Sequence, residues 1–522
     1  MPLTQLGQRQ LLREQLSDLR FIIHTSTRFG SAMPQPPKQQ DALPLLKGAA
    51  ATIADATAEG KPLPPVTRGR ASWIYAPMQL PRRIVFYLLV LAYACACPLA
   101  IGYALGYLVR PGAARGIVKT GLVSVASTPP GASVYIGKSR YTDKTPTTLR
   151  DLLPGVYPVS VLLKGHRPWR RDVAIRPGRA VVLEHLLLLP DTLPDTLALP
   201  GAFDTLVPIA ARDLLLLGRG PRLDDLRVYD LRLNTVAQVL PPGQELGSAR
   251  IRSTVTARNS PGALLRVHSR AGDRWLWVEP RREEVRVRDV TALLGAVPAG
   301  SRPAAPALAG DGVRGLGLDR RRLLCLTADG ALRVAEPEHP LLERFVEDPG
   351  LGAIAAQGGH YQIRMLSDDS LLFIGELGEL LTTRPPYLLV GDGVRDVVED
   401  PRRGRALVWQ ADQLGVLDLV AWRAAPERAA PAWVYQDGRD LQEAYWVHDG
   451  SYVLFRDDDR VRLLELDAPG PRPVVDVVQV KKNSAIAYFD DWGLLYYLDR
   501  VTGDLRTVEL VPDHAPLLRR VE

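Results

Sequence analysis

The sequence has few cysteines, and they are not placed to form a disulfide framework. Only three occur among 522 residues: Cys95 and Cys97 lie inside one apolar segment, and Cys325 stands alone. Disulfide-stapled secreted domains carry more cysteines at regular spacing. Cysteine usage therefore does not reveal the compartment. The Ala-Cys pairs at Cys95 and Cys97 faintly resemble a lipidation site, but the apolar run continues past both.

Signatures of catalysis, nucleotide binding and metal binding are also lacking. No P-loop and no G-x-S-x-G elbow occurs. The eight histidines show no ligand spacing, which argues against zinc; they are His24, His166, His185, His268, His339, His360, His448 and His514. Gly310–Gly315 formally matches G-x-G-x-x-G, but a strand pattern follows where a dinucleotide site needs a helix. We therefore predict no enzyme activity, no cofactor and no metal site.

Two aspartate clusters leave calcium binding as an alternative. Asp457–Asp459 and Asp490–Asp491 could supply oxygen ligands. Aspartate is also favoured in tight hairpins, because its side chain bonds the nearby backbone. We interpret both clusters as hairpin turns.

Long apolar runs are absent except for one. Residues 84–109 contain no charged side chain, and about 20 such residues suffice for a membrane-spanning helix. A buried core helix is the alternative, but soluble helices rarely stay apolar on every face for this length. A cleavable signal peptide would lie within about the first 30 residues. The pattern predicts one transmembrane helix at 84–109.

Two glycines in the outer half of this segment match a helix-packing motif. Gly102 and Gly106 form G-x-x-x-G, which can be the contact face of a helix dimer. Glycine is also simply frequent in spans. One interpretation is a homodimer that forms through this face. The other is that the two glycines only reflect the high frequency of glycine in membrane spans.

Charge is distributed unevenly along the chain. Residues 1–82 carry a net charge of +5, residues 83–189 carry +10, and residues 190–522 carry −8. The basic excess thus lies near the apolar segment, as expected for contact with anionic lipid or an acidic polymer. The acidic distal part argues against a nucleic-acid partner.

Residues 1–82 are expected to form a cytoplasmic tail. Leu12, Leu16, Leu19 and Ile23 repeat at helical spacing within Thr4–Thr25, which predicts a short amphipathic helix. Such a helix is either a partly ordered tail element or a docking helix. Residues 31–76 are rich in Pro, Ala, Gln and Gly and predict a flexible linker. Positive charges flank both ends of the span, so orientation rests mainly on the large C-terminal part, which suits an extracytoplasmic position.

Short alternating strands separated by turns begin after the apolar segment. The matching pieces are Val123-Ser-Val-Ala-Ser-Thr-Pro-Pro-Gly-Ala-Ser-Val-Tyr-Ile-Gly137, then Thr145-Pro146, Leu153-Pro-Gly155 and Lys164-Gly-His166. This order resembles the PEGA domain, a small β-sandwich of envelope proteins, over residues 120–189. Pro130 and His166 depart from the usual letters without disturbing the turns. The resemblance implies an extracytoplasmic structural or ligand-contacting module and no catalysis.

Basic residues crowd the last hairpin of this predicted domain. The candidate basic contact face consists of Arg167, Trp169, Arg170, Arg171, Arg176 and Arg179. Solvated charges that discourage strand pairing are one interpretation. The other is a contact face for phospholipid or an acidic wall polymer, with Trp169 as a stacking surface.

The rest of the chain contains an internal repeat. Gly310-Asp-Gly-Val-Arg recurs at Gly391, and a strand–turn–strand unit recurs seven times, on average about 45 residues apart. This period predicts a β-propeller of about seven blades over residues 201–515, with residues 190–200 as a linker. A solenoid or two stacked sandwiches are the alternatives. The last unit, around Tyr497–Leu505, is similar to blades of TolB-like and quinoprotein-like propellers.

These observations predict a mostly β protein: a PEGA-like sandwich and a propeller beyond one transmembrane helix. We expect a non-enzymatic, single-pass protein of the bacterial cell envelope. Its partners would be envelope proteins or a cell-wall polysaccharide such as peptidoglycan. The alternative is a ligand-sensing or enzymatic propeller that signals through the cytoplasmic tail. We also expect the sandwich and the propeller to be independent cores.

Overall fold

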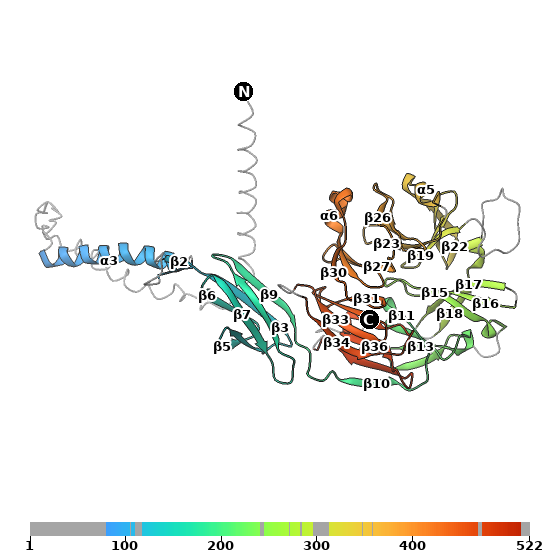
Figure 1. Ribbon diagram of the computed structural model, residues 1–522, viewed down its shortest axis with the longest axis horizontal. Coiled ribbons are helices and arrows are strands. Elements are labelled where there is room, and N and C mark those ends of the chain that lie inside the picture. Colours follow the sequence, from blue (N-terminus) through green and yellow to red (C-terminus); the bar gives the residue numbers. More distant parts are fainter. Residues whose placement is uncertain are drawn as a thin grey trace, which may run out of the picture. The chain divides into compact units, whose positions relative to one another are not determined.

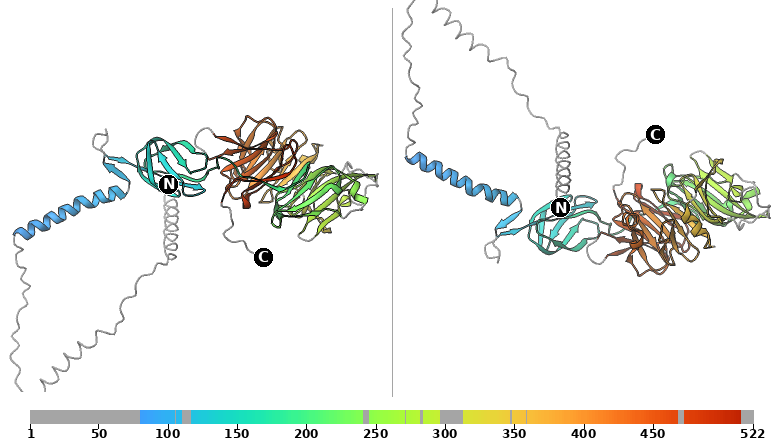
Figure 2. Two further views of the ribbon diagram at one scale, coloured as in Figure 1. Left: turned by 90° about the horizontal axis from the view of Figure 1, so that it is seen from below. Right: turned by 90° about the horizontal axis from the view of Figure 1, so that it is seen from above.

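The computed structural model describes residues 80–104, 106–109, 117–240, 245–270, 272–281, 284–295, 313–346, 348–357, 359–467 and 472–512 (Figure 1, Figure 2). The amphipathic helix predicted within Thr4–Thr25, the linker at 31–76 and the first Gly-Asp-Gly-Val-Arg glycines, Gly310 and Gly312, lie outside these residues.

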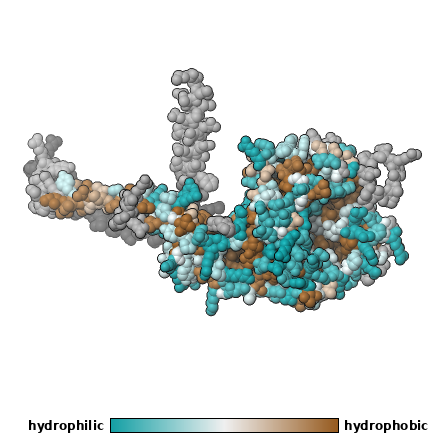
Figure 3. All heavy atoms as spheres, in the orientation of Figure 1, coloured by the Kyte–Doolittle hydropathy of each residue, from teal (hydrophilic) through white to brown (hydrophobic). Residues whose placement is uncertain are grey.

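The apolar segment forms helix α3, Leu80–Ala104. Among the described residues, Ile84–Ala104 is one helix of 21 residues that is long and apolar enough to cross a membrane. Its large side chains are exposed, and Figure 3 shows them as a hydrophobic stretch along the helix. A stretch of 21 helical residues spans about 32 Å at 1.5 Å per residue, close to the roughly 30 Å hydrocarbon thickness of a bilayer.

The helix ends five residues before the predicted limit of Val109. Gly106 has a φ of +80°, a left-handed conformation that glycine adopts easily and that ends helices. Its N–H donates to the carbonyl oxygen of Tyr103 at 2.9 Å. The chain then forms a hairpin of β1, Tyr107–Val109, and β2, Ile117–Lys119. The prediction of a helix across 84–109 is therefore wrong at its C-terminal end, where Gly106 has left the helix and Tyr107–Val109 is a strand.

Residues 121–187 form a β-sandwich of two sheets (Figure 1). One sheet has the order β6–β3–β9, in which β3 and β9 run parallel, and the other has the order β5–β4–β7–β8. Their bounds are β3 Gly121–Thr128, β4 Ser133–Ile136, β5 Ser139–Lys144, β6 Thr147–Leu152, β7 Gly155–Leu162, β8 Trp169–Ile175 and β9 Ala180–Leu187. Alternate residues of β3 are buried, as expected for strands with one face on a core. The predicted sandwich is confirmed.

The threonine of the predicted Thr-Pro turn has a structural role. The hydroxyl of Thr145 lies 2.7 Å from that of Ser127 and accepts a hydrogen bond from the Ala132 N–H at 2.9 Å. These buried groups tie the turn after β3 to the turn after β5. Buried polar groups are satisfied by such bonds, which explains why a threonine occupies this position.

The rest of the described chain forms seven blades of four strands, of which blades 3 and 4 are joined into one eight-stranded sheet (Figure 1, Figure 2). Blade 1 contains β11 Thr205–Ile209, β12 Leu214–Gly218, β13 Leu226–Asp230 and β14 Thr235–Gln238. Blade 2 contains β15 Arg250–Val255, β16 Ala263–Ser269, β17 Gly272–Pro280 and β18 Val285–Asp289. Blade 3 contains β19 Val313–Asp319, β20 Arg322–Thr327, β21 Leu332–Glu336 and β22 His339–Val346. Blade 4 contains β23 Tyr361–Met365, β24 Leu371–Ile374, β25 Leu380–Thr382 and β26 Leu388–Val390.

The last three blades continue the same up-and-down order. Blade 5 contains β27 Asp396–Asp400, β28 Arg405–Trp409, β29 Leu414–Asp418 and β30 Ala432–Tyr435. Blade 6 contains β31 Leu441–Val447, β32 Tyr452–Asp457, β33 Arg460–Glu465 and β34 Val474–Gln479. Blade 7 contains β35 Ala487–Phe489, β36 Leu494–Leu498 and β37 Leu505–Glu509, completed by β10 Asp195–Leu199. Short helices α4 Thr291–Gly295, α5 Pro349–Ala355 and α6 Leu419–Ala424 lie between strands.

Strand β10 corrects the predicted linker at 190–200. It pairs antiparallel with β37, so the first strand of the propeller sequence is the outermost strand of its last blade. Figure 1 shows green β10 beside the red strands of the C-terminal blade. The propeller therefore begins at Asp195 and not at residue 201. This non-local pairing joins the two ends of the ring, which short local patterns cannot reveal.

The sequence repeats correspond to defined strands. In each of the first six repeats, the two strands of the strand–turn–strand unit are the second and third strands of a blade, as in β12 and β13. In the seventh unit, they are the first two strands, β35 and β36. The second Gly-Asp-Gly-Val-Arg, at Gly391, lies between β26 and β27 and links blades 4 and 5. Apolar clusters fill the spaces between blades, for example Leu206 and Leu217 of blade 1 with Phe489 and Leu505 of blade 7.

Candidate interaction surface

The six residues of the predicted basic face do not form one surface. Strand β8 runs from Trp169 to Ile175, about 20 Å at 3.3 Å per residue. Arg167 precedes this strand at one end, whereas Arg176 and Arg179 follow it at the other. Arg170 lies on the strand and is exposed like those three. The prediction of a single contact face is therefore wrong, because the strand separates its members.

Trp169 and Arg171 lie in a junction with the propeller. The indole N–H of Trp169 donates to Oε1 of Glu465 at 2.9 Å, and Trp169 is only 7% exposed. Arg171 Nη2 donates to Oε2 of the same carboxylate at 2.9 Å. The guanidinium carbon of Arg171 also lies 5.6 Å from the Trp169 ring centre, within cation–π range. Trp169 is thus not the free stacking surface that we predicted.

Apolar contacts extend this junction. Leu187 and Leu189, at the end of the sandwich, pack in one cluster with Val447 and Tyr452 of the propeller. The Leu187 N–H donates to the Tyr452 hydroxyl oxygen at 2.9 Å. Burial, and then the charge of Glu465, raise the pKa of Tyr452, so the phenol stays neutral. Contrary to our expectation of two independent cores, the sandwich and the propeller share buried apolar side chains.

The junction partners in the propeller could not be found from the sequence. Glu465 follows Trp169 by 296 positions and Arg171 by 294. All three residues lie in sequence patterns that are ordinary for a β-strand. A weak signal was Trp169 itself, a large aromatic within an arginine-rich strand.

The two glycines of the predicted helix-packing face are not on one helix. Gly102 lies in α3, whereas Gly106 lies beyond its end with a φ of +80°. The carbonyl oxygen of Gly106 accepts hydrogen bonds from the N–H of Thr120 at 2.7 Å and its hydroxyl at 2.9 Å. Gly106 thus connects the end of the helix to the start of the sandwich. The G-x-x-x-G face is corrected accordingly, because its second glycine has left the helix.

The inner strands of the propeller carry charged side chains paired with other protein groups. Arg364 of β23 binds Asp396 of β27 through two bonds of 2.8 Å, joining blades 4 and 5. Arg258, after β15 of blade 2, reaches blade 6: its Nη2 donates to the Ala444 carbonyl oxygen at 2.7 Å. Its guanidinium carbon lies 4.4 Å from the ring centre of Tyr445. Arg258 therefore connects two blades that are not neighbours.

Glu443 lies beside this contact on β31. Its Oε2 accepts the N–H of Ile486 at 2.8 Å. Burial raises the pKa of Glu443 to about 7, an effect that the nearby Arg456 and Arg258 only partly offset. The carboxyl group is therefore costly to ionise in the folded propeller.

The raised pKa of Glu443 predicts that the free energy of unfolding of the propeller depends on pH. The folded-state pKa of Glu443, about 7, lies above the ordinary value of 4.5. The unfolded chain then releases this proton first, so the contribution of Glu443 to stability falls as the pH rises from about 4.5 to about 7. We expect Glu443→Gln to reduce that fall, measured as the free energy of unfolding in urea at pH 5 and pH 8. The exposed Glu427→Gln is the control, and an unchanged pH dependence in Glu443→Gln would contradict the assignment.

The aspartate clusters lie in turns, as their interpretation as hairpins predicted. Asp457 ends β32 and accepts the N–H groups of Arg439 and Asp440, each at 2.8 Å. It also binds Arg462 at 2.9 Å. Asp490 and Asp491 lie in a short 3-10 turn between β35 and β36. Within the described ranges, no group of three or more His, Cys, Asp or Glu side chains is arranged to hold a metal ion.

Comparisons with known proteins match separate parts of the chain. The family model described as the PEGA domain matches residues 120–187. A search of curated protein sequences found no match.

Several solved β-propellers also align with this chain. The Cps50 (Swd1) propeller domain of Myceliophteria thermophila has 14% identity and a TM-score of 0.39, covering 60% of this chain and 99% of its own. The RRP9 WD40 repeats have 13% identity and a TM-score of 0.36, and the alignment covers 60% of this chain and 97% of the RRP9 chain. PorZ has 12% identity and a TM-score of 0.35, and the alignment covers 60% of this chain and 39% of the PorZ chain. PorZ is described as a surface component of the type-IX secretion system of Porphyromonas gingivalis. Similarity at this level carries no functional argument, and the blade count rests on the strand order.

The sandwich and the propeller can now be identified. The sandwich shows the predicted turn order and two sheets, and the family match covers nearly its whole length. The distal strands form seven blades closed by β10. Residues 120–187 are therefore a PEGA domain, which is followed by a seven-bladed β-propeller.

Proposed function

We propose that this chain is a membrane-anchored, non-enzymatic protein of the bacterial cell envelope that presents its propeller for binding. Helix α3 serves as the anchor, with residues 1–82 in the cytoplasm and the β domains outside. The partners are envelope proteins or a wall polysaccharide. The alternative is a ligand-sensing or enzymatic propeller.

The observation that carries the proposal is the buried junction between the two β domains. Trp169 and Arg171 bind one carboxylate of the propeller, and Leu187 packs into the propeller's apolar cluster. A flexible linker would leave the propeller free to tumble. A shared core instead makes the PEGA domain a rigid support, which suits presentation of a binding surface.

The charged groups on and next to the inner strands support binding over catalysis. Arg364, Asp396 and Arg258 are occupied with protein partners that join blades. Residues used in this way stabilise the ring. A catalytic site would instead require titratable groups directed at a substrate position.

Protease accessibility tests the orientation. With tags at both ends, protease added to intact spheroplasts is expected to digest the propeller and to spare residues 1–82. In lysed spheroplasts both parts should be cut. Digestion of the tail with protection of the propeller would contradict the proposed topology.

Capture of partners tests the proposed role. The full chain, cross-linked in cells and purified, is expected to retain envelope proteins or wall fragments that a chain ending at residue 194 does not retain. Both forms keep the anchor. Recovery of the same set with both forms would mean that the propeller is not the binding module.

A further inference from the structure

A series of hydrogen bonds connects the end of helix α3 to one end of the PEGA domain. The Gly106 N–H donates to Tyr103 in the last turn of the helix, and the Gly106 carbonyl oxygen accepts from Thr120. The Thr120 carbonyl oxygen in turn accepts the N–H of Gly178 at 2.8 Å. Gly178 lies in the turn between β8 and β9, so this turn is linked to the last turn of the helix through Gly106 and Thr120.

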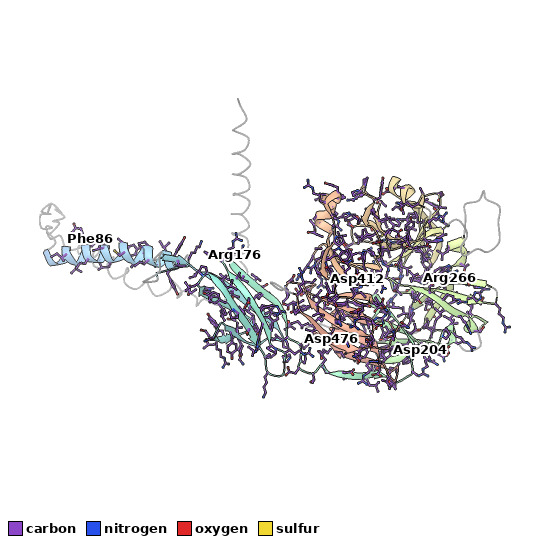
Figure 4. All side chains as sticks on the ribbon, in the orientation of Figure 1. Phe86, Arg176, Asp204, Arg266, Asp412 and Asp476 are labelled. Atoms are coloured by element: carbon purple, nitrogen blue, oxygen red, sulfur yellow. The ribbon has the colours of Figure 1, made fainter. Side chains whose placement is uncertain are left out.

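Other turns gather at the same end of the sandwich. In the strand pairing, Gly121 is opposite Leu152, and Gly155 is opposite Ile175. The turns after β4, β6 and β8 therefore lie with Gly121, where the chain enters the domain. Figure 4 labels Arg176 at this end of the strands.

This end is basic, and none of its basic side chains is paired with an acidic side chain among the residues that the structure describes. Five exposed basic side chains occur here: Lys119, Lys138, Arg150, Arg176 and Arg179. In residues 119–121, 137–138, 150–155 and 176–179 the one acidic residue is Asp151. Within the described part of the chain, no ion pair joins these five side chains to a carboxylate. Elsewhere arginines commonly bind carboxylates, as Arg506 does with Asp195.

Two apolar side chains accompany these charges. Val156, at the start of β7, is 68% exposed. Tyr107 follows the helix and is 41% exposed, with Lys119 Nζ 5.7 Å from its ring centre. Aromatic rings and long cationic side chains are typical of the bilayer interface.

We propose that this end of the PEGA domain binds the anionic headgroups of the bilayer in which α3 is anchored. The inference rests on the proposed membrane anchor. A helix of 21 residues places Ala104 at the edge of the hydrocarbon layer. The hydrogen bonds through Gly106 and Thr120 then hold the β8–β9 turn on the side of the domain that faces the headgroups, whose field acts over roughly 8 Å at physiological salt. Each basic residue near such a surface strengthens its association about fivefold.

Hydrogen exchange of the full chain in nanodiscs tests this proposal. We expect backbone amides of the β4–β5 and β8–β9 turns to exchange several-fold more slowly in discs containing phosphatidylglycerol than in phosphatidylcholine discs. High salt should abolish the difference, because the contact is electrostatic. The turn between β7 and β8, at the other end of the sandwich, is the internal control and should not respond.

A charge-matched pair of variants separates this surface from general basicity. Arg176→Gln with Arg179→Gln should remove the protection in anionic discs, whereas Arg167→Gln with Arg170→Gln, the same charge change elsewhere on the domain, should leave it intact. Equal exchange in both lipids, or equal effects of the two pairs, would overturn the proposal. Protection that appears only when soluble wall polymer is added to neutral discs would also overturn it, in favour of a polymer site.

The anchor itself is tested separately in the same preparation. If the chain does not co-elute with discs of either lipid, the proposed membrane anchoring has failed. If it co-elutes with both but shows no lipid-dependent exchange, only the headgroup contact has failed.

Discussion

Trp169→Ala is expected to lower the free energy of unfolding by about 3–5 kcal/mol, the usual cost of truncating a buried tryptophan. The substitution leaves a cavity and removes the N–H that binds Glu465 at 2.9 Å. Urea unfolding of the full chain in detergent should give the difference. The effect should be coupled to Glu465, since both residues share one contact.

The neighbouring residue provides the control for this prediction. Arg170 is adjacent in sequence but exposed, so Arg170→Ala should change stability by less than about 0.5 kcal/mol. A similarly small effect of Trp169→Ala would show that the junction contributes little, and the rigid-support argument would lose its basis.

Replacing Asp195–Leu199 by a Gly-Ser stretch of equal length is expected to destabilise the propeller by about 2–4 kcal/mol. Strand β10 completes blade 7 by pairing with β37. A Gly-Ser stretch has low strand propensity and loses more conformational entropy on pairing, so it should release this ladder, in which each hydrogen bond contributes about 1 kcal/mol. Exchange of the β37 amides should accelerate most, because that strand becomes an exposed edge.

A side-chain control isolates the strand pairing. Asp195 binds Arg506 at 2.9 Å in a partly exposed ion pair, and such pairs contribute about 0–1 kcal/mol. Asp195→Ala should therefore have a small effect. If the Gly-Ser replacement were no more destabilising than Asp195→Ala, ring closure by β10 would not be supported.

Much of the architecture follows from local patterns. The charge-free run predicted a helix in the right place, and period-two alternation with turn residues predicted the sandwich strands. Seven repeats of the strand–turn–strand unit predicted the seven blades. These signals are local because side chains a few residues apart share one face of a helix or strand.

The candidate surface was predicted less well. The arginines of the predicted face are close together in the sequence. Strand β8 lies between them, however, and separates them in the folded chain. Arg176 and Arg179 ended near Lys119, whereas Trp169 and Arg171 reached Glu465. One helix boundary was also missed, because a glycine can continue an apolar helix or end it, and only its φ decides.

The sequence alone thus determined the order of elements: one apolar helix, a PEGA domain and a seven-unit propeller, with basic charge concentrated beside the helix. Tertiary structure decided which distant residues meet. The ring closed through β10 and β37, the junction formed around Glu465, and Thr120 was bonded between the helix end and the β8–β9 turn. The physical reason is that these contacts join segments whose local patterns carry no information about their partners, so only the packing of the folded chain selects them.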